Sequence, residues 1–396
     1  MTRIHLTFPV LPPALDGIGD HTARLAGALA EHAAVTVLTT PEAAAQAEVP
    51  TGVQVRSALR WRGRRTRHID ASGVAAAVAD ERPEALLLQY NPTSWGRRGL
   101  NPLLPLAVRA ARRAHPALRV GLMVHETFYP RTTLRQTLLN VVQQAQLRAL
   151  LRAAHVVFVS TEAWVPVLGR WAPTTPFVHL PVGSNIEDAG WTREAARAAL
   201  EIPEETLVAG VFGTATRPDR LLPLVRAAAE RLRLEQEAQG GASLVLYVGP
   251  DGPAARAALA GLPVRDLGAL PVAEVSRALA ALDLHLAPFQ HGVSTRRGSF
   301  VAGLQHGVPS VSTRGPHTDR LLLDAAGTAC LLTPEDDASA YADQAAALAA
   351  DPARRWVMAE AARALYGAAF AWSHGAERVL SGLRGEPSAA VPVRAR

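Results

Sequence analysis

The segment GVSTRRGSFVAGLQHGVP, residues 292–309, combines the kinds of groups that bind phosphates. Two hydroxyl side chains lead into two neighbouring guanidiniums, and a glycine then opens an apolar stretch of helical type. The first N–H groups of a helix have no partner within it and favour a negatively charged ligand. These residues therefore predict a diphosphate site, with Arg296 as a candidate catalytic cation. The expected donors are Ser294, Thr295, Arg296, Arg297 and Gly298.

A second phosphate-binding segment is expected at VFGTATRPDR, residues 211–220, where a strand-like run ends in a glycine and a polar loop. Its backbone, hydroxyl and guanidinium donors are Gly213, Thr214, Arg217 and Arg220. Surface arginines are usually solvated, and that interpretation of Arg220 stays open beside the functional one. Together with the arginines of 292–309, Arg217 would form a two-sided clamp that stabilises the charge of a departing diphosphate.

Two further segments place polar residues directly after strand-like runs. In DGIGDHTARLAGALA, residues 16–30, Gly17 and Gly19 would let the backbone approach the diphosphate, although a tight strand–helix connection explains them equally well. In VGLMVHETFYP, residues 120–130, His125 is either a catalytic residue or a structural histidine. The residues expected to contact a second substrate are Asp20, His21, Tyr90, Asn91 and Glu126.

These segments lie within alternating strand-like and helical patterns, which predict parallel sheets covered by helices on both faces. The strand-like runs are Ile4–Phe8, Val35–Thr39, Ala85–Gln89, Arg119–Val124, Val156–Ser160, Pro176–Leu180, Leu207–Phe212, Leu244–Val248, Leu284–Ala287 and Val308–Ser312. They form two series, so we expect an α/β protein with two doubly wound, Rossmann-like domains. Ligands of such sheets bind beyond the carboxyl ends of the strands, and two facing domains would enclose a cleft there.

The domain boundaries follow from breaks in this periodicity. Glycine, asparagine and proline residues interrupt the pattern between the two series, in Pro181–Pro203. We predict an N-terminal domain at 1–183, an interdomain linker at 184–204 and a second domain at 205–353. Closing helices would occupy 354–384, and a flexible tail would follow at 385–396.

Composition excludes several function classes. The 396 residues are 48% hydrophobic and 19% charged, as is typical of a folded soluble protein. The net charge of +6 comes from arginine alone, and the absence of lysine excludes a lysine Schiff base and a P-loop. A lone cysteine, Cys330, excludes an internal disulfide, and no apolar run approaches the ~20 residues that span a bilayer. Because the start does not resemble a signal peptide, we expect a cytoplasmic protein.

Five segments, in order, resemble the retaining nucleotide-sugar glycosyltransferases of the GT-B kind, and more narrowly family four (glycosyl transferases group 1). They are DGIGDHTARLAGALA (16–30), LPVGSNI (180–186), FGTATR (212–217), HGVPSVSTRG (306–315) and FAWSHGAERVL (370–380). The resemblance spans nearly the whole chain. It implies that a sugar is transferred from a UDP- or GDP-sugar donor to a hydroxyl of a glycolipid or polysaccharide acceptor, with retention. It also implies that the last helix crosses back onto the N-terminal domain and that the second substrate is this acceptor.

The chain departs from that family at two glutamates, whose positions are occupied by Ser294 and Ala302 within the GVSTRRGS variant. The acid that holds the donor ribose and the usual phosphate-binding lysine are missing, so the four arginines are expected to compensate. Gly213 and Asp319 are candidates for the nucleoside and ribose. In the implied reaction the leaving diphosphate itself accepts the proton of the acceptor hydroxyl. We therefore expect no metal and no other cofactor.

Alternative functions and partners remain open. A nucleotide-sugar epimerase on the same fold and a non-catalytic sugar-nucleotide-binding partner subunit are the alternatives to a transferase. The arginine-rich stretch 60–68 carries no nucleic-acid-binding motif, so no nucleic-acid partner is expected. This stretch and the helical pattern 131–154 could instead give weak peripheral contact with anionic lipid at the inner membrane face. An exposed loop and a core helix are the respective alternatives.

Overall fold

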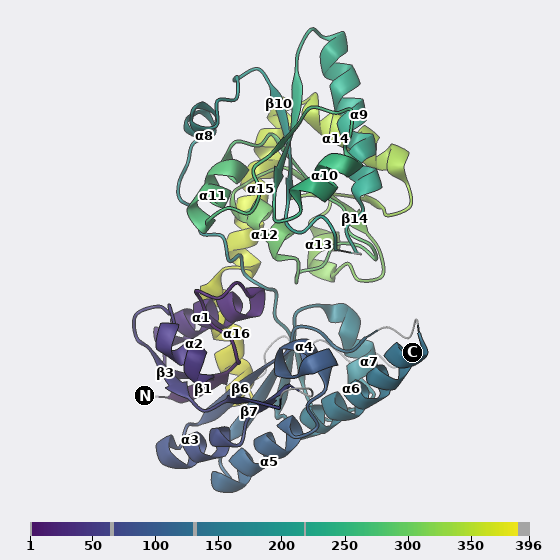
Figure 1. Cartoon of the computed structure of the whole chain (residues 1–396). Coiled ribbons are helices and arrows are strands. Elements are labelled where there is room, and N and C mark those ends of the chain that lie inside the picture. Colours follow the sequence, from purple (N-terminus) through teal and green to yellow (C-terminus); the bar gives the residue numbers. More distant parts are fainter. Residues whose placement is uncertain (1, 64–66, 130–132, 218, 387–396) are drawn as a thin grey trace. The chain divides into compact units, whose positions relative to one another are not determined.

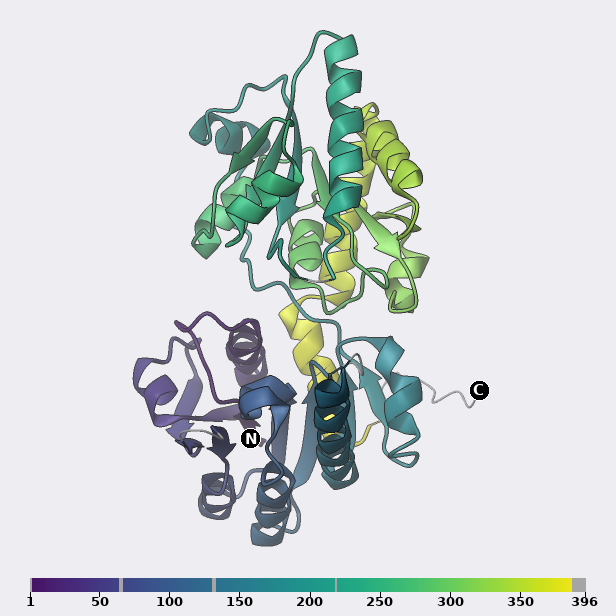
Figure 2. The same cartoon turned by 45° about the vertical axis from the view of Figure 1, so that its right-hand side comes forward.

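The computed structural model describes residues 2–63, 67–129, 133–217 and 219–386, and the chain forms two compact units (Figure 1; Figure 2). Unit 1 contains the residues up to Pro181 and those from Trp372 onward, and unit 2 contains Val182–Ala371. Each unit has its own parallel sheet with helices on both faces. The predicted α/β class with two Rossmann-like sheets is thereby confirmed.

Within the described residues, the main sheet of unit 1 has seven strands, and every strand runs parallel to its neighbours. In sheet order they are β3 (Val53–Ser57), β2 (Ala34–Thr39), β1 (Arg3–Thr7), β6 (Ala85–Tyr90), β7 (Arg119–Val124), β8 (Val156–Val159) and β9 (Phe177–His179). The central strands are almost wholly buried, because helices cover both faces of the sheet. A separate antiparallel hairpin joins β4 (Arg60–Arg62) to β5 (His68–Asp70).

The helices of unit 1 divide between the two faces of this sheet. One core contains residues of α3, α5 and α6, and a second core contains residues of α1 and α16. The bounds of the helices are α1 Gly17–Ala30, α2 Pro41–Gln46, α3 Gly73–Glu81, α4 Pro92–Trp95, α5 Leu104–Ala114, α6 Leu134–Ala153, α7 Val165–Gly169 and α16 Trp372–Arg384, with short 3-10 turns at Arg97–Gly99 and Glu162–Trp164. Because α16 comes from the end of the chain, unit 1 is not complete without a segment that follows unit 2 in sequence.

Unit 2 is built on a six-stranded parallel sheet, counted over the residues that the structure describes. In sheet order the strands are β12 (Val264–Asp266), β11 (Ser243–Val248), β10 (Leu207–Phe212), β13 (Leu284–Ala287), β14 (Ser310–Arg314) and β15 (Leu331–Pro334). Numbered within the unit, this is the 3-2-1-4-5-6 order of dinucleotide-binding folds. Its carboxyl edge between β10 and β13 is the point where the strand order reverses, and ligands of such sheets bind at that point.

The helices of unit 2 also cover both faces of its sheet. Apolar residues of α9 and α14 join one core, and those of α11, α12 and α15 join two clusters that contain other residues of the same strands. The helices are α8 Arg193–Ala199, α9 Leu222–Ala238, α10 Gly252–Ala258, α11 Val272–Ala280, α12 Gly298–Gln305, α13 Arg320–Asp324, α14 Ala338–Ala349 and α15 Pro352–Ala369. Cys330 is fully buried in one of these clusters, as expected for a small apolar side chain.

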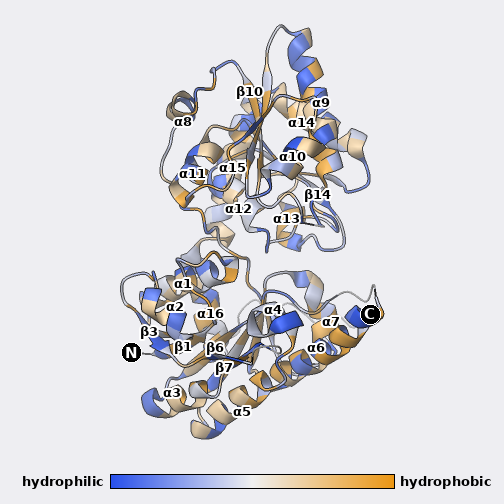
Figure 3. Ribbon diagram, viewed as in Figure 1, coloured by the Kyte–Doolittle hydropathy of each residue, from blue (hydrophilic) through white to orange (hydrophobic). Residues whose placement is uncertain are grey.

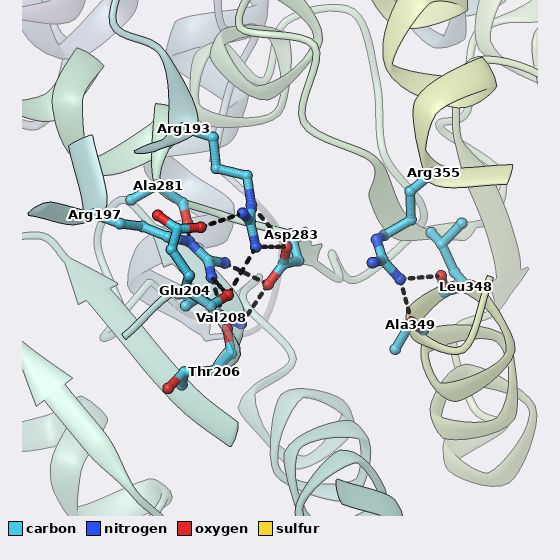
Figure 4. A network of polar contacts seen from close by, with 10 residues as sticks. All are labelled: Arg193, Arg197, Glu204, Thr206, Val208, Ala281, Asp283, Leu348, Ala349 and Arg355. Atoms are coloured by element: carbon cyan, nitrogen blue, oxygen red, sulfur yellow. Dashed lines mark hydrogen bonds and ion pairs between the residues drawn. The ribbon is translucent and has the colours of Figure 1, made fainter. Parts of the chain in front are cut away.

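The segment predicted as a linker, 184–204, is instead packed on unit 2 through a buried arginine of α8. Arg197 is 0% exposed and donates hydrogen bonds to the carbonyls of Ala281, Glu204 and Thr206 and to Asp283 Oδ2, at 2.6–3.0 Å (Figure 4). Asp283 also accepts from the backbone N–H of Val208 and from Arg193. Apolar residues of the same segment, Ile186, Leu200 and Ile202, also pack in a core cluster of unit 2.

All ten strand-like runs form strands, but the sequence did not indicate the β4–β5 hairpin or the strands β3, β12 and β15 of the two main sheets. Strands β3, β12 and β15 lie at the edges of their sheets. Every residue of β12 is partly exposed, and every residue of β3 is partly or fully exposed, so neither has the continuous apolar run of a central strand. Residues 387–396 of the predicted tail lie outside the described residues, as do 64–66 of the arginine-rich stretch and 131–132 of the helical pattern 131–154.

Candidate functional site

Two loops of unit 2 meet at the carboxyl edge of its sheet. The loop after β10 pairs with the loop after β13 through an isolated bridge between Arg220 and Phe289. The N–H of Gln290 also donates to the carbonyl of Asp219 at 2.8 Å. Thr313, on β14, fixes the second loop, because its hydroxyl donates to the carbonyl of Phe289 at 2.6 Å and accepts its N–H at 2.8 Å. These contacts bring the two predicted phosphate-binding segments side by side within one unit.

Two arginines, one from each segment, pack against the same aromatic ring. The guanidinium carbons of Arg220 and Arg297 lie 4.5 and 4.7 Å from the ring centre of Phe289. Arg220 is 8% exposed and Arg297 is 7% exposed. Burial lowers the pKa of each to about 10, so both remain charged at neutral pH. Arg220 is thus a buried residue of the site, and its interpretation as a solvated surface arginine is wrong.

The carboxylate of Asp219 pairs with arginines of both loops. It accepts from Arg297 Nη1 at 2.5 Å, and its other oxygen lies 3.4 Å from Arg217 Nε. Burial opposes ionisation of Asp219, but Arg297 and Arg217 outweigh this effect and lower its pKa. Asp219 thus links arginines of both loops, because Arg217 follows β10 and Arg297 follows β13.

Several buried donors at this edge have no hydrogen-bond partner among the described residues. They are Arg220 Nη1, Arg297 Nε and Ser294 Oγ. Arg220 uses its other terminal nitrogen, which donates to the carbonyl of Phe212 at 2.6 Å. Buried polar groups in proteins are nearly always paired, so unpaired donors of this kind indicate a ligand or water that completes them. An anion with several acceptor oxygens, such as a diphosphate, fits this set.

The backbone around these donors leaves room for a close approach. A side chain at Gly298, the first residue of α12, would meet nothing within 4 Å, so the start of this helix is open. Gly213 has a φ of +108°, and a Cβ there would lie 3.2 Å from Arg220 Nη2. Arg296 and Thr214 are partly exposed on the same two loops, and the side chain of Arg217 is 54% exposed.

Thr295 and Asp319 bind each other instead of presenting free groups. The N–H and the hydroxyl of Thr295 both donate to Asp319 Oδ2 at 2.7 Å, and both residues are at most 1% exposed. In this arrangement Asp319 holds the loop that carries Ser294 and the arginines. We therefore do not retain Asp319 as a ribose ligand, or Thr295 as a diphosphate donor, in the site proposed below.

In unit 1, the first turn of α1, which contains Gly17 and Gly19, already donates hydrogen bonds to a carboxylate. Asp16 is the N-cap of α1, and its Oδ1 accepts the N–H groups of Ile18 and Gly19 at 2.9 Å. The N–H of Gly19 is thus taken, and an aspartate beside Gly17 would repel a diphosphate. We do not retain Gly17 and Gly19 as diphosphate donors. Asp20 lies in the first turn, where burial, followed by repulsion from Asp16, raises its pKa.

Histidines gather at the carboxyl edge of the sheet of unit 1. The rings of His21 and His125 meet edge to face with centroids 4.8 Å apart, and Trp372 packs on His21 at 5.1 Å. His125 Nε2 lies 2.6 Å from Oε1 of Gln89, which is completely buried. Burial lowers the pKa of His21 to about 4, and burial, together with a smaller effect of His21, lowers the pKa of His125 well below its usual value. Both rings are therefore neutral at neutral pH.

The remaining predicted acceptor-binding residues of unit 1 differ in how accessible they are to a substrate. Tyr90 is completely buried in the core, where its hydroxyl accepts from Gln146 Nε2 at 3.1 Å, so it is not available to a substrate. Asn91 is the N-cap of α4 and accepts the N–H of Thr93 at 3.0 Å. Glu126 is partly exposed next to His125. In the described residues, no group of three or more histidine, cysteine, aspartate or glutamate side chains could hold a metal ion.

Sequence reasoning missed three residues of these sites, namely Asp219, Phe289 and Gln89. Asp219 lies between the predicted arginines in RPDR, so its position alone could have identified it. Phe289 and Gln89 look like ordinary strand-end residues, and only the contacts that they make distinguish them.

Comparisons with known proteins agree with this architecture. No protein-family model and no curated protein sequence matches the chain. Sucrose-phosphate synthase from Thermosynechococcus elongatus is similar in structure, with a TM-score of 0.66 at 17% identity, covering 97% of this chain and 99% of that one. WaaG, a glycosyltransferase involved in lipopolysaccharide biosynthesis, gives 0.65 at 16% identity, covering 96% and 100%. HepE from Anabaena, solved with UDP and glucose, gives 0.63 at 14% identity, covering 97% and 100%. The chain therefore has the GT-B fold.

Proposed function

We propose that the protein is a glycosyltransferase that moves a sugar from a nucleoside-diphosphate sugar to an acceptor hydroxyl with retention of configuration. The observation that carries the proposal is the set of buried, incompletely paired donors of Arg220, Arg297 and Ser294 at the switch point of the sheet of unit 2. The similarity to HepE, which was solved with UDP and glucose, supports a nucleotide-sugar donor.

The diphosphate of the donor would lie against these groups. Arg220 and Arg297 are held on Phe289, so they need little reorganisation to neutralise the charge that develops as the diphosphate departs. Arg217 and Arg296 lie on the same loops and would add guanidiniums from the surface. The amide start of α12 at Gly298 would supply backbone N–H groups. In retaining transfer the departing oxygen can accept the proton of the acceptor hydroxyl, so no strong protein base is needed.

We assign the acceptor to unit 1, at the carboxyl edge that carries His21, His125 and Glu126. The uncharged rings of His21 and His125 suit sugar hydroxyls better than phosphates, and the carboxyl group of Glu126 adds a further hydrogen-bonding group. The acceptor would be a glycolipid or a polysaccharide, handled in the cytoplasm at the inner membrane face. Contact with lipid would come from α6, whose N-terminal half carries exposed apolar residues. Figure 3 colours parts of this helix as hydrophobic. None of the helices in the described part of the chain is long and apolar enough to cross a bilayer.

The donor site is tested by thermal unfolding with UDP, GDP, UDP-glucose and GDP-mannose. A ligand at a hundred times its Kd stabilises the native state by about 2.7 kcal/mol, so one nucleotide series should raise the Tm. Arg297→Gln should reduce this shift by about half or more, because the loss of a buried charged hydrogen bond costs about 1.5–3 kcal/mol, or roughly 10- to 150-fold in affinity. Arg233→Gln is the control, since Arg233 pairs with Glu237 on the surface of α9 and should keep the shift.

If Arg297→Gln does not fold, the more exposed Arg217→Gln provides the same test with a smaller loss. A full shift in both variants would mean that the nucleotide binds elsewhere. Incubation of the parent with the stabilising nucleotide sugar then decides the reaction. Release of the nucleoside diphosphate supports a transferase, an epimerised sugar would show an epimerase, and binding with neither product would show a sugar-nucleotide-binding subunit.

A further inference from the structure

We infer that Gln89 is a positioning residue that keeps His125 as its Nε2–H tautomer, so that the Nδ1 lone pair accepts a hydrogen bond from a substrate hydroxyl. The assignment of a substrate to this ring rests on the function proposed above. The tautomer itself rests on geometry alone. The residue pair joins the ends of two adjacent strands of unit 1, β6 and β7.

The backbone brings the two side chains together. Gln89 pairs with Met123 in the register of β6 and β7, and His125 lies directly after β7. The N–H of His125 donates to the carbonyl of Tyr90 at 2.9 Å, which continues the ladder by one step beyond the strand. The imidazole is therefore held at the carboxyl edge by the sheet itself.

The direction of the hydrogen bond determines the tautomer. A neutral imidazole carries one proton, and an amide oxygen can only accept. With the amide of Gln89 oriented so that Oε1 lies 2.6 Å from His125 Nε2, the proton resides on Nε2 and Nδ1 carries the lone pair. The ring is neutral because it is buried. Of the titratable groups in the described residues, only His21 on α1 adds to the lowering of its pKa.

The neighbours of the ring restrict it further. His21 packs edge to face on His125, and Trp372 of α16 packs edge to face on His21. Gln89 is 0% exposed and His125 is 8% exposed, so the ring has little freedom to turn over. With a strongly lowered pKa, His125 is a poor base. Its Nδ1 instead orients a hydroxyl, which is compatible with a reaction in which the diphosphate takes the proton.

Nitrogen chemical shifts of the histidine rings in the isotope-labelled full chain test the tautomer without any substrate. Near neutral pH the parent should show His125 with a protonated Nε2 and a bare Nδ1. Gln89→Leu, which has a similar volume and no acceptor, should yield a mixture of both tautomers. Gln144→Leu is the matched control, because Gln144 is a buried glutamine of unit 1 that contacts Asn140 and Arg148, and it should leave the shifts of His125 unchanged.

Gln89→Glu gives the opposite signature. A carboxylate beside Nε2 should raise the pKa of His125, so the ring gains its second proton as the pH falls, and Nδ1 can no longer accept. Release of nucleoside diphosphate by this variant should therefore decrease toward low pH, while the parent shows no such decrease in the same range. At neutral pH, Gln89→Leu should lower kcat/KM about tenfold, the effect of one lost hydrogen bond.

A parent ring protonated at Nδ1, or an unchanged tautomer in Gln89→Leu, would overturn the inference. If Gln89→Leu does not fold, the parent shifts and Gln89→Glu decide it. An Nε2–H ring in a protein that binds no nucleotide sugar would refute the proposed function and leave the role of Gln89 in the tautomer intact. Full activity in Gln89→Leu with a mixed tautomer would refute only the link to the substrate.

Discussion

Arginine residues do two different kinds of work in unit 2. Each guanidinium nitrogen of Arg197 has a partner, with four hydrogen bonds in all at 0% exposure, and the residue holds α8 to the rest of the unit. Arg220 and Arg297 are buried to a similar degree, yet each keeps a nitrogen without a partner in the described residues. Burial of a charge is costly unless it is paired, so the first arrangement is expected for structure and the second for binding.

This difference predicts the stability of two neighbouring variants. Arg197→Met should lower the free energy of unfolding by about 3–5 kcal/mol, because it removes one partner of a buried ion pair and leaves Asp283 incompletely compensated. Arg193→Met should cost at most about 1 kcal/mol, since Arg193 lies on the same helix and binds the same carboxylate but is 38% exposed. Urea unfolding measures both. Equal losses would show that the two contacts with Asp283 stabilise the protein equally.

At the scale of elements, α6 stands out among the helices of unit 1. Its C-terminal half joins the core through Leu147, Leu150 and Leu151, but its N-terminal half presents apolar side chains to solvent. The exposed residues are Leu134 at 80%, Leu138 at 64%, Val141 at 54% and Val142 at 42%. The helix contains arginines and no acidic residue, so the expected core helix is only half buried, and its free half is suited to an anionic lipid surface.

We therefore expect the protein to sediment with anionic vesicles at low salt and to be released as the salt concentration rises. The double variant Leu138→Gln, Val141→Gln should weaken this association about tenfold or more, because inserting a leucine and a valine contributes up to about 1.5–3 kcal/mol each. Leu234→Gln is the control, since Leu234 is equally exposed, at 54%, on α9 of unit 2. Equal vesicle binding by the parent, the double variant and Leu234→Gln would show that α6 does not contact lipid. No binding by the parent would contradict the lipid association itself.

At the scale of the whole molecule, the two units differ in how the chain builds them. Unit 2 is one continuous stretch, Val182–Ala371, with its own sheet and its own cores. Unit 1 needs α16 from the end of the chain, because Val379, Leu380 and Leu383 belong to the core that covers one face of its sheet. The proposed diphosphate donors lie wholly within unit 2.

A fragment of residues 182–371 should therefore unfold cooperatively and should keep the Tm increase given by the nucleotide that stabilises the full chain. A fragment of residues 1–181 should expose that face of its sheet and should not give a cooperative transition. Calorimetry of both fragments measures this. A folded fragment 182–371 without the nucleotide shift would mean that binding needs residues of unit 1.

Much of the fold could be predicted from the sequence, because continuous apolar runs separated by helical patterns are local properties of buried parallel strands. The types of hydrogen-bond donors at the site could also be predicted, since arginine, hydroxyl and glycine residues directly follow those runs. The sequence by itself thus determined the class of sheet and the chemistry at its carboxyl edge.

Only the tertiary structure decided which of these donors are free. Ser294 and Thr295 are neighbours with the same hydroxyl chemistry, but Asp319 takes both donors of Thr295, whereas the hydroxyl of Ser294 has no partner among the described residues. In the same way the carboxylate of Asp16 accepts the N–H of Gly19, and the side chain of Gln89 contacts Nε2 of His125 and leaves Nδ1 to a substrate. A hydrogen-bond donor is available only after the folded chain has brought, or failed to bring, an acceptor to it. Most of those acceptors come from distant positions in the sequence.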